Sequence, residues 1–283
     1  MTNSYMCIFC SSNLQENLYH GILKCKNCGH ISADLRIDED ELIKYYDRGY
    51  FSGVEYINYA ADKKLHQKKF KTHLKIIKKF IDPIRHKNIF EIGCAYGFFL
   101  GTAQKYFDTV SGIDISEDGI RYAQEKLNLN VIQGDFLKHD FGEQKFDIVC
   151  MWDTIEHLFN PRLFLDKINK HTESGALLAL TTGDIESLNA RMRKGKWRFI
   201  KPPEHIHFFS KKTLADILNN YGFDIIYNRY SGFYARFDDI AYELFVQSKK
   251  APWLYNLLHN IPLSKCYFYL NLYDIMYVIA RKR

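Results

Sequence analysis

The sequence predicts an α/β fold, in which a parallel sheet is covered by helices on both faces, with a small cysteine-bearing module at the N-terminus. Short apolar segments alternate with amphipathic ones from residue 88 onward, as in a parallel sheet whose crossovers are helices. Acidic residues follow successive apolar segments at the positions where strands should end. Four cysteines form two C-x2-C pairs near the start of the chain.

The composition is that of a water-soluble globular protein, with 47% hydrophobic and 25% charged residues. Its 283 residues suit one large domain with a small appendage, and the net charge of +6 favours anionic partners. No apolar run approaches the ~20 residues of a membrane span, and no basic-then-apolar leader opens the chain. We therefore expect a cytoplasmic protein, whose seven cysteines are thiols or metal ligands.

The two cysteine pairs, within residues 1–35, predict a zinc-ribbon-like module. Cys7, Cys10, Cys25 and Cys28 can place four thiolates at the corners of a tetrahedron around Zn²⁺. Four thiolates leave no open coordination position, so this zinc would be structural. The alternative is two disulfides in a secreted module, which the missing leader disfavours.

Residues 36–87 are expected to join the module to the main domain as a helical linker or lid. Residues 38–47 are typical of a short helix with acidic residues in its first turn. Aromatic residues then follow as far as Tyr59. They either pack between the two parts of the protein or close over a ligand, and packing is the interpretation that we favour.

An amphipathic helix is predicted over residues 61–82, because Phe70, Leu74, Ile77 and Ile81 recur at helical spacing. Its other face is rich in lysine. Such a run is typical of a solvated helix face and less often marks a docking surface for a polyanion. The proline that follows ends the helix.

The main domain is expected over residues 88–283. Its first five strands are predicted at residues 88–92, 109–113, 130–133, 146–151 and 175–180. Helices are predicted at residues 98–107, 117–127, 162–170 and 211–221. An aromatic-rich insertion at about residues 236–270 is expected to form helices that cover a ligand site or make a homodimer surface. An interfacial membrane contact is the use that we favour least for it.

The segment from Glu91 to Gly97 predicts a ligand-binding turn between a strand and a helix. Its two glycines, four residues apart, allow a sharp turn and a close approach of the backbone to a ligand. The E-x-G-x-x-x-G spacing lacks the glycine pattern of a dinucleotide fingerprint and the GK[ST] of a P-loop. The carboxylate would oppose a phosphate and welcome an amino group.

Acidic residues at the expected strand ends predict a nucleoside site. Asp114 follows the second strand, where a carboxylate can accept hydrogen bonds from a ribose diol. Asp135 can accept from an exocyclic amine, and the neighbouring Phe136 can pack on a base. Asp153 follows the fourth strand. Because no phosphate-binding motif is present, the expected ligand is a nucleoside without phosphates.

Together, Glu91–Gly97, Asp114, Gly134–Phe136 and Met151–Asp153 resemble the class I S-adenosylmethionine-dependent methyltransferases. The resemblance covers about residues 88–182 and extends more loosely to the C-terminus. It implies a Rossmann-like, seven-stranded methyltransferase sheet whose last two, antiparallel strands are residues 223–230 and 274–281.

By this resemblance, the turn after Glu91 lies along the methionine part of S-adenosylmethionine, Asp114 holds the ribose, and Asp135 and Phe136 hold the adenine. The cofactor-binding residues that it implies are Glu91, Gly93, Cys94, Ala95, Gly97, Asp114, Ile115, Asp135, Phe136, Trp152 and Asp153.

Methyl transfer to a hydroxyl needs a base that removes the proton, and residues 153–157 (DTIEH) offer one. This segment is similar to the D-x-x-E-H segment of ubiquinone-type O-methyltransferases, some of which use a divalent cation there. We weigh a structural role for Glu156 and His157 above catalysis and above a cation held with Asp153.

A second base is offered by residues 197–210 (WRFIKPPEHIHFFS). They resemble the E-H-x-x-x-F-S segment of sugar- and glycan-modifying methyltransferases, in which the histidine or a neighbouring acid is placed as base. If the segment is extended, His207 points the same way as His205, because strand side chains alternate. The catalytic candidates are therefore His205, Glu204, His157 and His207. The alternative for each histidine is a buried, hydrogen-bonded structural role.

A basic loop precedes Glu204, which suits a phosphorylated or nucleotide-linked substrate. Its cations are Arg191, Arg193, Lys194, Lys196, Arg198 and Lys201. We expect O-methylation of a sugar, nucleotide-sugar or other small anionic glycan-pathway metabolite. The alternatives are an RNA methyltransferase that contacts nucleic acid through its zinc module, a C-methyltransferase of a nucleotide-linked deoxysugar, and a cofactor-binding scaffold without catalysis.

Overall fold

The computed structural model describes residues 6–13, 15–35, 41, 63–242, 245, 252–259, 261 and 266–283. The helix expected at residues 38–47 and the aromatic-rich segment that follows it therefore lie outside the described residues, apart from Glu41. No described helix is both long enough and apolar enough to cross a membrane.

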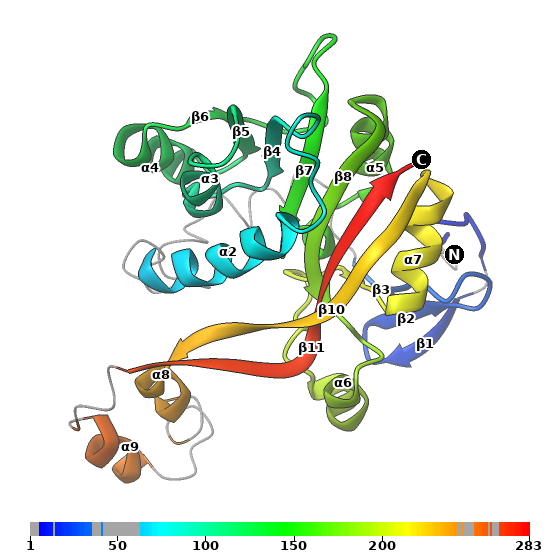
Figure 1. The fold of residues 1–283 in the computed structure, drawn as a ribbon. Coiled ribbons are helices and arrows are strands. Elements are labelled where there is room, and N and C mark those ends of the chain that lie inside the picture. The colour runs from blue at the N-terminus through cyan, green and yellow to red at the C-terminus, as the bar shows by residue number, and fades with distance from the viewer. Residues whose placement is uncertain are drawn as a thin grey trace.

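A seven-stranded sheet forms the centre of the protein, in the order β10-β11-β8-β7-β4-β5-β6 (Figure 1). Its strands are β4 (Asn88–Ile92), β5 (Thr109–Asp114), β6 (Asn130–Gln133), β7 (Phe146–Trp152), β8 (Thr172–Gly183), β10 (Phe223–Arg236) and β11 (Tyr267–Lys282). Strands β4 to β8 pair in parallel, whereas β11 is antiparallel to both β8 and β10. The predicted seven-stranded sheet with two antiparallel last strands is confirmed.

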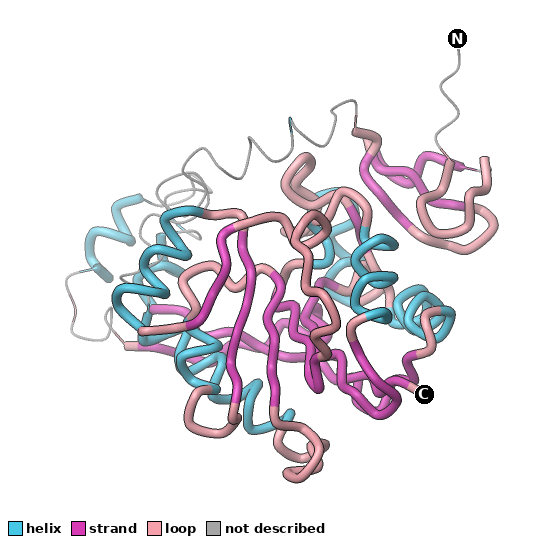
Figure 2. The backbone as a smooth tube through the Cα atoms, turned by 90° about the horizontal axis from the view of Figure 1, so that it is seen from above, coloured by secondary structure: helices cyan, strands magenta, loops and turns pink. Residues whose placement is uncertain are grey.

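Helices cover both faces of this sheet, as predicted (Figure 2). One face carries α2 (Lys63–Ile77), α3 (Phe98–Ala103) and α4 (Glu117–Leu127). The other carries α5 (Pro161–Lys170) and α7 (Lys211–Asn220). The other described helices are η2 (Ile155–His157), α6 (Leu188–Arg193), η3 (Lys194–Lys196), α8 (Phe237–Tyr242) and α9 (Pro252–His259).

Helix α2 buries the face that its spacing predicts, including Phe70, Leu74 and Ile77. It ends five residues earlier than predicted. The reason is that the hydrogen bonds after Ile77 contract to the i→i+3 type, with Lys79 N donating to the Ile76 carbonyl over 3.0 Å.

The cysteine module shares a sheet with the large domain. Its strands β1 (Gln15–Tyr19), β2 (Ile22–Cys25) and β3 (Ile31–Ala33) are extended by β9 (His207–Phe208), in the order β1-β2-β3-β9. The described part of the module, through residues 31–33, is therefore joined by backbone hydrogen bonds to the segment that carries the candidate base.

Strands β10 and β11 extend well beyond the sheet, which the sequence did not predict. Strand β8 pairs with β11 only between Ile275 and Arg281, so Phe233–Arg236 and Tyr267–Leu270 pair with each other alone. Aromatic side chains favour such cross-strand pairing. The insertion predicted from residue 236 thus begins at the far end of a two-stranded ribbon, which leads to α8 and α9 (Figure 1).

Asp274 joins β11 to the segment that contains α6. Its carboxylate, 1% exposed as a side chain, accepts hydrogen bonds from Asn189 Nδ2 at 2.7 Å, Trp197 Nε1 at 3.0 Å and Arg198 at 2.8 Å. These donors hold the pKa of Asp274 below its usual range, although burial alone would raise it.

We predict that Asp274→Ala destabilises the protein by about 3 kcal/mol, because it leaves a buried indole N–H and a guanidinium without their acceptor. Urea unfolding at neutral pH measures this. The control is Asp118→Ala, whose side chain is 65% exposed and should matter little. Equal midpoints for the two variants would contradict the role of Asp274.

Candidate active site

The turn after β4 has the backbone geometry that its glycines predict. Gly93 and Gly97 adopt left-handed φ angles of 74° and 69°, and Ala95 adopts 45°. A Cβ at Gly93 would lie 2.8 Å from Thr154 Oγ1, so only glycine fits between the turn and the loop after β7. The turn thus lies directly against that loop, with the buried Cys94 within it.

Two carboxyl groups are buried at this edge of the sheet. Glu91 is 2% exposed, and its Oε2 has no hydrogen-bond partner among the described residues. Burial raises the pKa of Glu91 well above its ordinary value, and the charge of Asp114 raises it further. Asp114 itself accepts hydrogen bonds from Ala95 N at 2.7 Å and Ser116 N at 2.8 Å, which fixes it against the turn. The neighbouring Ile115 is exposed.

Asp135 and Phe136 differ in environment. The Asp135 carboxylate accepts a hydrogen bond from Leu137 N at 2.8 Å in the loop after β6. Phe136 is 4% exposed and lies in the core, stacked on Phe164 and beside Phe90. The structure therefore places Phe136 in the core, where it supports the Asp135 loop, and we do not retain it as an adenine contact.

Asp153, after β7, pairs with a lysine that sequence analysis did not single out. Its Oδ2 lies 2.5 Å from Lys69 Nζ, and its Oδ1 accepts from Thr181 Oγ1 at 2.7 Å. Partial burial alone would raise the pKa of Asp153, but the Lys69 ammonium and the Thr181 hydroxyl hold it below its usual range. The neighbouring Trp152 is buried between α2 and the sheet.

The two segments that offer a base meet at one place. One carboxylate oxygen of Glu156 and one ring nitrogen each of His157 and His205 all lie within 4.8 Å of one another. His157 Nδ1 lies 2.8 Å from the Glu204 carbonyl, and the rings of His157 and His205 are in edge contact at 4.6 Å. Burial, with the charge of Asp153, raises the pKa of Glu156 to about 8. We call Glu156, His157 and His205 the histidine cluster.

His205 is held as a neutral imidazole. Its Nδ1 donates to the Phe199 carbonyl at 2.7 Å, which leaves Nε2 as the proton-accepting nitrogen. Nε2 lies 3.7 Å from Glu204 Oε1. Burial and the neighbouring His157 lower the pKa of His205 to about 3.

His207 does not point the same way as His205, contrary to the prediction. Its Nδ1 lies 3.0 Å from His30 Nε2 of the cysteine module. The alternation argument fails because only His207–Phe208 is a strand, whereas residues 202–204 form a turn and residues 205 and 206 are irregular. Burial lowers the pKa of His207 to about 4. His207 belongs to the contact between the two sheets.

The four N-terminal cysteines converge, as predicted. Their sulfur atoms all lie within 4.8 Å of one another. The Sγ atoms of Cys7 and Cys28 are 3.4 Å apart, and those of Cys10 and Cys25 are 3.5 Å apart. These separations exceed a disulfide bond of about 2.05 Å and suit a common ligand set.

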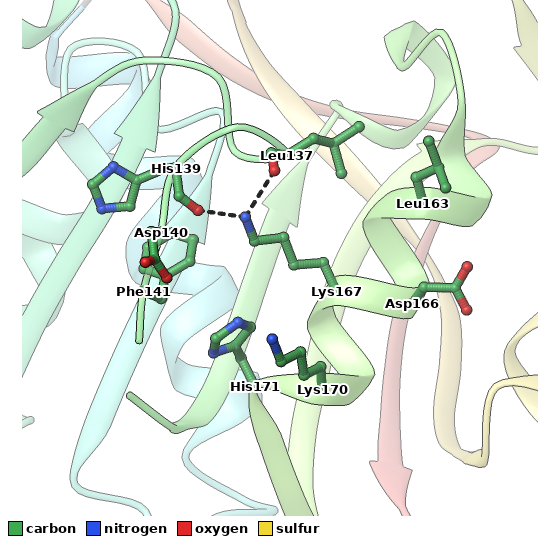
Figure 3. Close-up of a pocket in the computed structure, with 9 residues that line it drawn as sticks. All are labelled: Leu137, His139, Asp140, Phe141, Leu163, Asp166, Lys167, Lys170 and His171. Atoms are coloured by element: carbon green, nitrogen blue, oxygen red, sulfur yellow. Dashed lines mark hydrogen bonds between the residues drawn. The ribbon is translucent and has the colours of Figure 1, made fainter. Parts of the chain in front are cut away.

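A cavity of about 430 Å³ lies away from these groups (Figure 3). Its lining residues are Leu137, His139, Asp140, Phe141, Leu163, Asp166, Lys167, Lys170 and His171. Lys167 Nζ donates to the carbonyls of Leu137 and His139. Since the cavity contains none of the predicted site residues, we assign it no role.

Residues 62–228 match the family model described as a methyltransferase domain. The chain belongs to this methyltransferase family. The match includes the turn, the strand-end acids and the histidine cluster.

Curated relatives of this methyltransferase match it over part of their length. N-methyltransferase 4 of Papaver somniferum is 40% identical over 29% of this chain and 26% of that protein. The ubiquinone biosynthesis O-methyltransferase of Coxiella burnetii is 26% identical over 53% of this chain and 64% of that protein. The chain therefore spans between about a quarter and somewhat less than two thirds of these relatives.

Solved structures share the fold of this methyltransferase. Magnesium protoporphyrin IX methyltransferase of Synechocystis, with bound SAH, has a TM-score of 0.54 and 15% identity, over 87% of this chain and 100% of that chain. The complex between the Haloferax volcanii Trm112 activator and a methyltransferase has a TM-score of 0.57 and 11% identity, over 87% of this chain and 99% of that chain.

We predict that Lys69→Met lowers stability at neutral pH by about 1–2 kcal/mol, because Asp153 loses its counter-charge. The value is modest because the Asp153 side chain is 35% exposed. The folded-state pKa of Asp153 lies below its unfolded value of about 3.9, so the pair stabilises above that pH and the contribution is lost as the pH falls.

Urea unfolding at neutral pH and near pH 4 measures the effect. The difference from the parent protein should shrink at the lower pH, where the variant's Asp153 takes up a proton. Lys71→Met, at an exposed position of the same helix, is the control and should show neither effect. A pH-independent difference would contradict the ion pair as its cause.

Proposed function

We propose that this methyltransferase transfers a methyl group to a hydroxyl of a small, anionic acceptor of the sugar or nucleotide-sugar type, with His205 as the base. The observation that supports the proposal most is the histidine cluster. It brings a neutral imidazole, oriented by a carbonyl, to the loop that follows Asp153. The alternative acceptors, RNA and a deoxysugar carbon, are outcomes of the test below.

The residues of the turn fit the cofactor. S-adenosylmethionine supplies an electrophilic methyl group when it is bound. The Glu91 carboxyl, which has an oxygen without a partner among the described residues, would accept hydrogen bonds from an ammonium group and would then ionise. Asp114 is already fixed by two backbone N–H groups and would present its remaining lone pairs to a ribose diol.

A histidine with a low pKa is sufficient for this reaction. The proton of a hydroxyl becomes very acidic as the oxygen gains a methyl group, so His205 Nε2 need accept it only late in the transfer. The base must be neutral, which the pKa of about 3 ensures at physiological pH. Glu204, 3.7 Å away, would then stabilise the imidazolium.

A divalent cation is the alternative use of the histidine cluster. Glu156, His157 and His205 offer one carboxylate and two imidazole ligands within 4.8 Å, a set that suits a transition metal. In that case activity would vanish on chelation and return with added metal, and His205 would act as a ligand instead of a base.

The acceptor is proposed to be anionic because of the loop around α6. Arg191, Arg193, Lys194 and Lys196 are exposed there, whereas Arg198 is paired with the buried Asp274. The loop follows β8 directly, at the edge of the sheet where the parallel strands end. Four exposed cations at that edge would attract a phosphorylated substrate.

We predict that His205→Asn lowers turnover by about 10²–10⁴-fold and leaves the affinity for S-adenosylmethionine unchanged. The assay transfers labelled methyl from S-adenosylmethionine to sugar phosphates, nucleotide sugars and total tRNA, tested separately. Calorimetric titration measures cofactor affinity. The matched control is His139→Asn, which removes a histidine that lies away from the cluster.

Equal losses of turnover and cofactor affinity would assign His205 a structural role and contradict the base. Label in tRNA alone would overturn the small-molecule acceptor in favour of RNA. Label that is retained as a C–methyl group in a sugar would overturn O-methylation.

We also propose that Cys7, Cys10, Cys25 and Cys28 bind one structural Zn²⁺. The proposal rests on four converging sulfur atoms and on the position of the module beside the base. Strand β3 pairs with β9, and Ala33 N donates to the Ile206 carbonyl at 2.9 Å. The module would therefore hold the residue that follows His205.

We predict that metal analysis finds about one zinc per chain and that Cys25→Ser loses it. Hydrogen exchange should then rise in residues 204–209, because β9 loses its ordered partner strand. Cys266→Ser, at an exposed cysteine outside the module, is the control and should keep the zinc. Full zinc content in Cys25→Ser would contradict the proposed ligand set.

A further inference from the structure

The ribbon formed by β10 and β11 and the helices at its end carry large apolar side chains that stay exposed in the described protein. We define the arm as residues 233–242, 252–259 and 267–273. Half of the exposed large hydrophobic side chains of the described residues lie in it. They are Tyr242, Trp253, Leu257, Tyr267, Phe268, Tyr269, Leu272 and Tyr273. A two-stranded hairpin is marginally stable in water without a further layer, so the arm is suited to an apolar surface.

Helix α6 exposes a second group of apolar side chains, and positively charged residues surround it. Leu188 and Met192 are 73% and 75% exposed and lie four residues apart, on one side of the helix. The exposed cations Arg191, Arg193, Lys194 and Lys196 adjoin them. Ala190 lies on the opposite side of α6, where it is buried in the same cluster as Trp197. This packing fixes α6 with Leu188 and Met192 facing outward.

The arm and α6 lie at the same edge of the molecule. Asn189 of α6 donates to Asp274 at the base of the arm, and both elements project below the large sheet in Figure 1. Positive charge also adjoins the arm from α2, where Lys68 Nζ lies 5.1 Å from the Tyr267 ring centroid and 5.8 Å from that of Tyr234.

We propose that this edge docks onto an anionic phospholipid bilayer, with the arm and α6 as its two points of insertion. Tryptophan, tyrosine and aliphatic side chains gain most at the boundary between headgroups and hydrocarbon. The flanking lysines and arginines are complementary to anionic headgroups. No membrane-crossing helix is needed, and none is present among the described residues.

A second copy of the chain fits this surface less well than an anionic bilayer does. Self-association through a two-fold axis brings identical patches together, so the cations around α6 and near Lys68 would face one another. Like charges at an interface cost free energy. An anionic bilayer meets the same charges favourably and covers the same apolar side chains.

Docking would also turn the carboxyl edge of the sheet toward the bilayer, because α6 directly follows β8. Resting on the proposed function, this implies that the anionic sugar-type acceptor is the headgroup of a membrane-anchored amphiphile. Vesicle binding itself does not depend on that function, so the two can fail separately.

The test uses the intrinsic fluorescence of the full chain. Of its three tryptophans, Trp152 and Trp197 are buried and Trp253 is 70% exposed. Vesicles of phosphatidylcholine with phosphatidylglycerol should shift the emission to the blue and sediment with the protein. Vesicles of phosphatidylcholine alone should bind much more weakly, and salt should weaken the binding.

Three variants identify the surface. Leu257→Glu in the arm and Leu188→Glu in α6 should each weaken binding by about tenfold, and Lys194→Glu with Lys196→Glu by about tenfold or more. Ile84→Glu is the matched control, because Ile84 is 88% exposed in the loop before β4, at the other edge of the sheet. It should bind as the parent protein does.

Three results would overturn the proposal. The first is the absence of a blue shift and of sedimentation with anionic vesicles. The second is equal weakening by Ile84→Glu and Leu257→Glu. The third is a blue shift that rises with protein concentration without vesicles and accompanies a dimer in light scattering, which would assign the arm to a second copy.

Discussion

The backbone of Ile206 is held from two sides, and the arrangement of the site depends on it. Its N–H donates to the Glu156 carbonyl at 2.9 Å, and its carbonyl accepts from Ala33 N at 2.9 Å. The first bond fixes the segment to the loop after β7, and the second fixes it to the cysteine module. His205 and His207, on either side of Ile206, therefore face different surroundings, one toward the histidine cluster and the other toward His30.

The carboxyl edge of the sheet carries more acidic side chains than basic ones. Glu91, Asp114, Asp153 and Glu156 meet there, and Lys69 is the cation that pairs with Asp153. Burial and mutual repulsion raise the pKa values of Glu91 and Glu156. These carboxyl groups therefore favour the protonated form, which reduces the negative charge at this edge. A ligand with a cationic centre would relieve this cost, and the sulfonium and ammonium of the family cofactor are such centres.

The fold and the glycine turn after β4 could be predicted because both leave local signals. Strand-end acids, glycines with positive φ and cysteine pairs are each set by a few neighbouring residues, and the structure has them where the sequence indicated. Lys69 could not be singled out, since its position in a lysine-rich helix hides that it turns inward. The helical spacing did indicate the inward position of Lys69, because it lies next to Phe70 and four residues before His73, both of which are buried.

Other features depended on contacts between distant segments. His157 and His205, which are in contact, lie about 48 positions apart in the sequence. The residues of β3 and β9 that pair lie about 176 positions apart. No local pattern encodes such pairs. The ribbon of the arm was missed for a similar reason, because aromatic residues at 267–273 are as typical of a covering helix as of an exposed strand. The environment of Phe136 also depended on partners, Phe90 and Phe164, that lie far along the chain.

The protonation states of the histidine cluster favour a hydroxyl acceptor over an amine. An amine is protonated at neutral pH and must lose a proton before its lone pair can attack, which asks for a base whose pKa approaches that of the ammonium. Burial lowers the pKa of His205 to about 3 and that of His157 to about 4, so neither could perform that step. A hydroxyl keeps its lone pairs free at all times and releases its proton only as the new bond forms. A neutral histidine that is a weak base can accept such a proton, which is why we propose a hydroxyl as the acceptor.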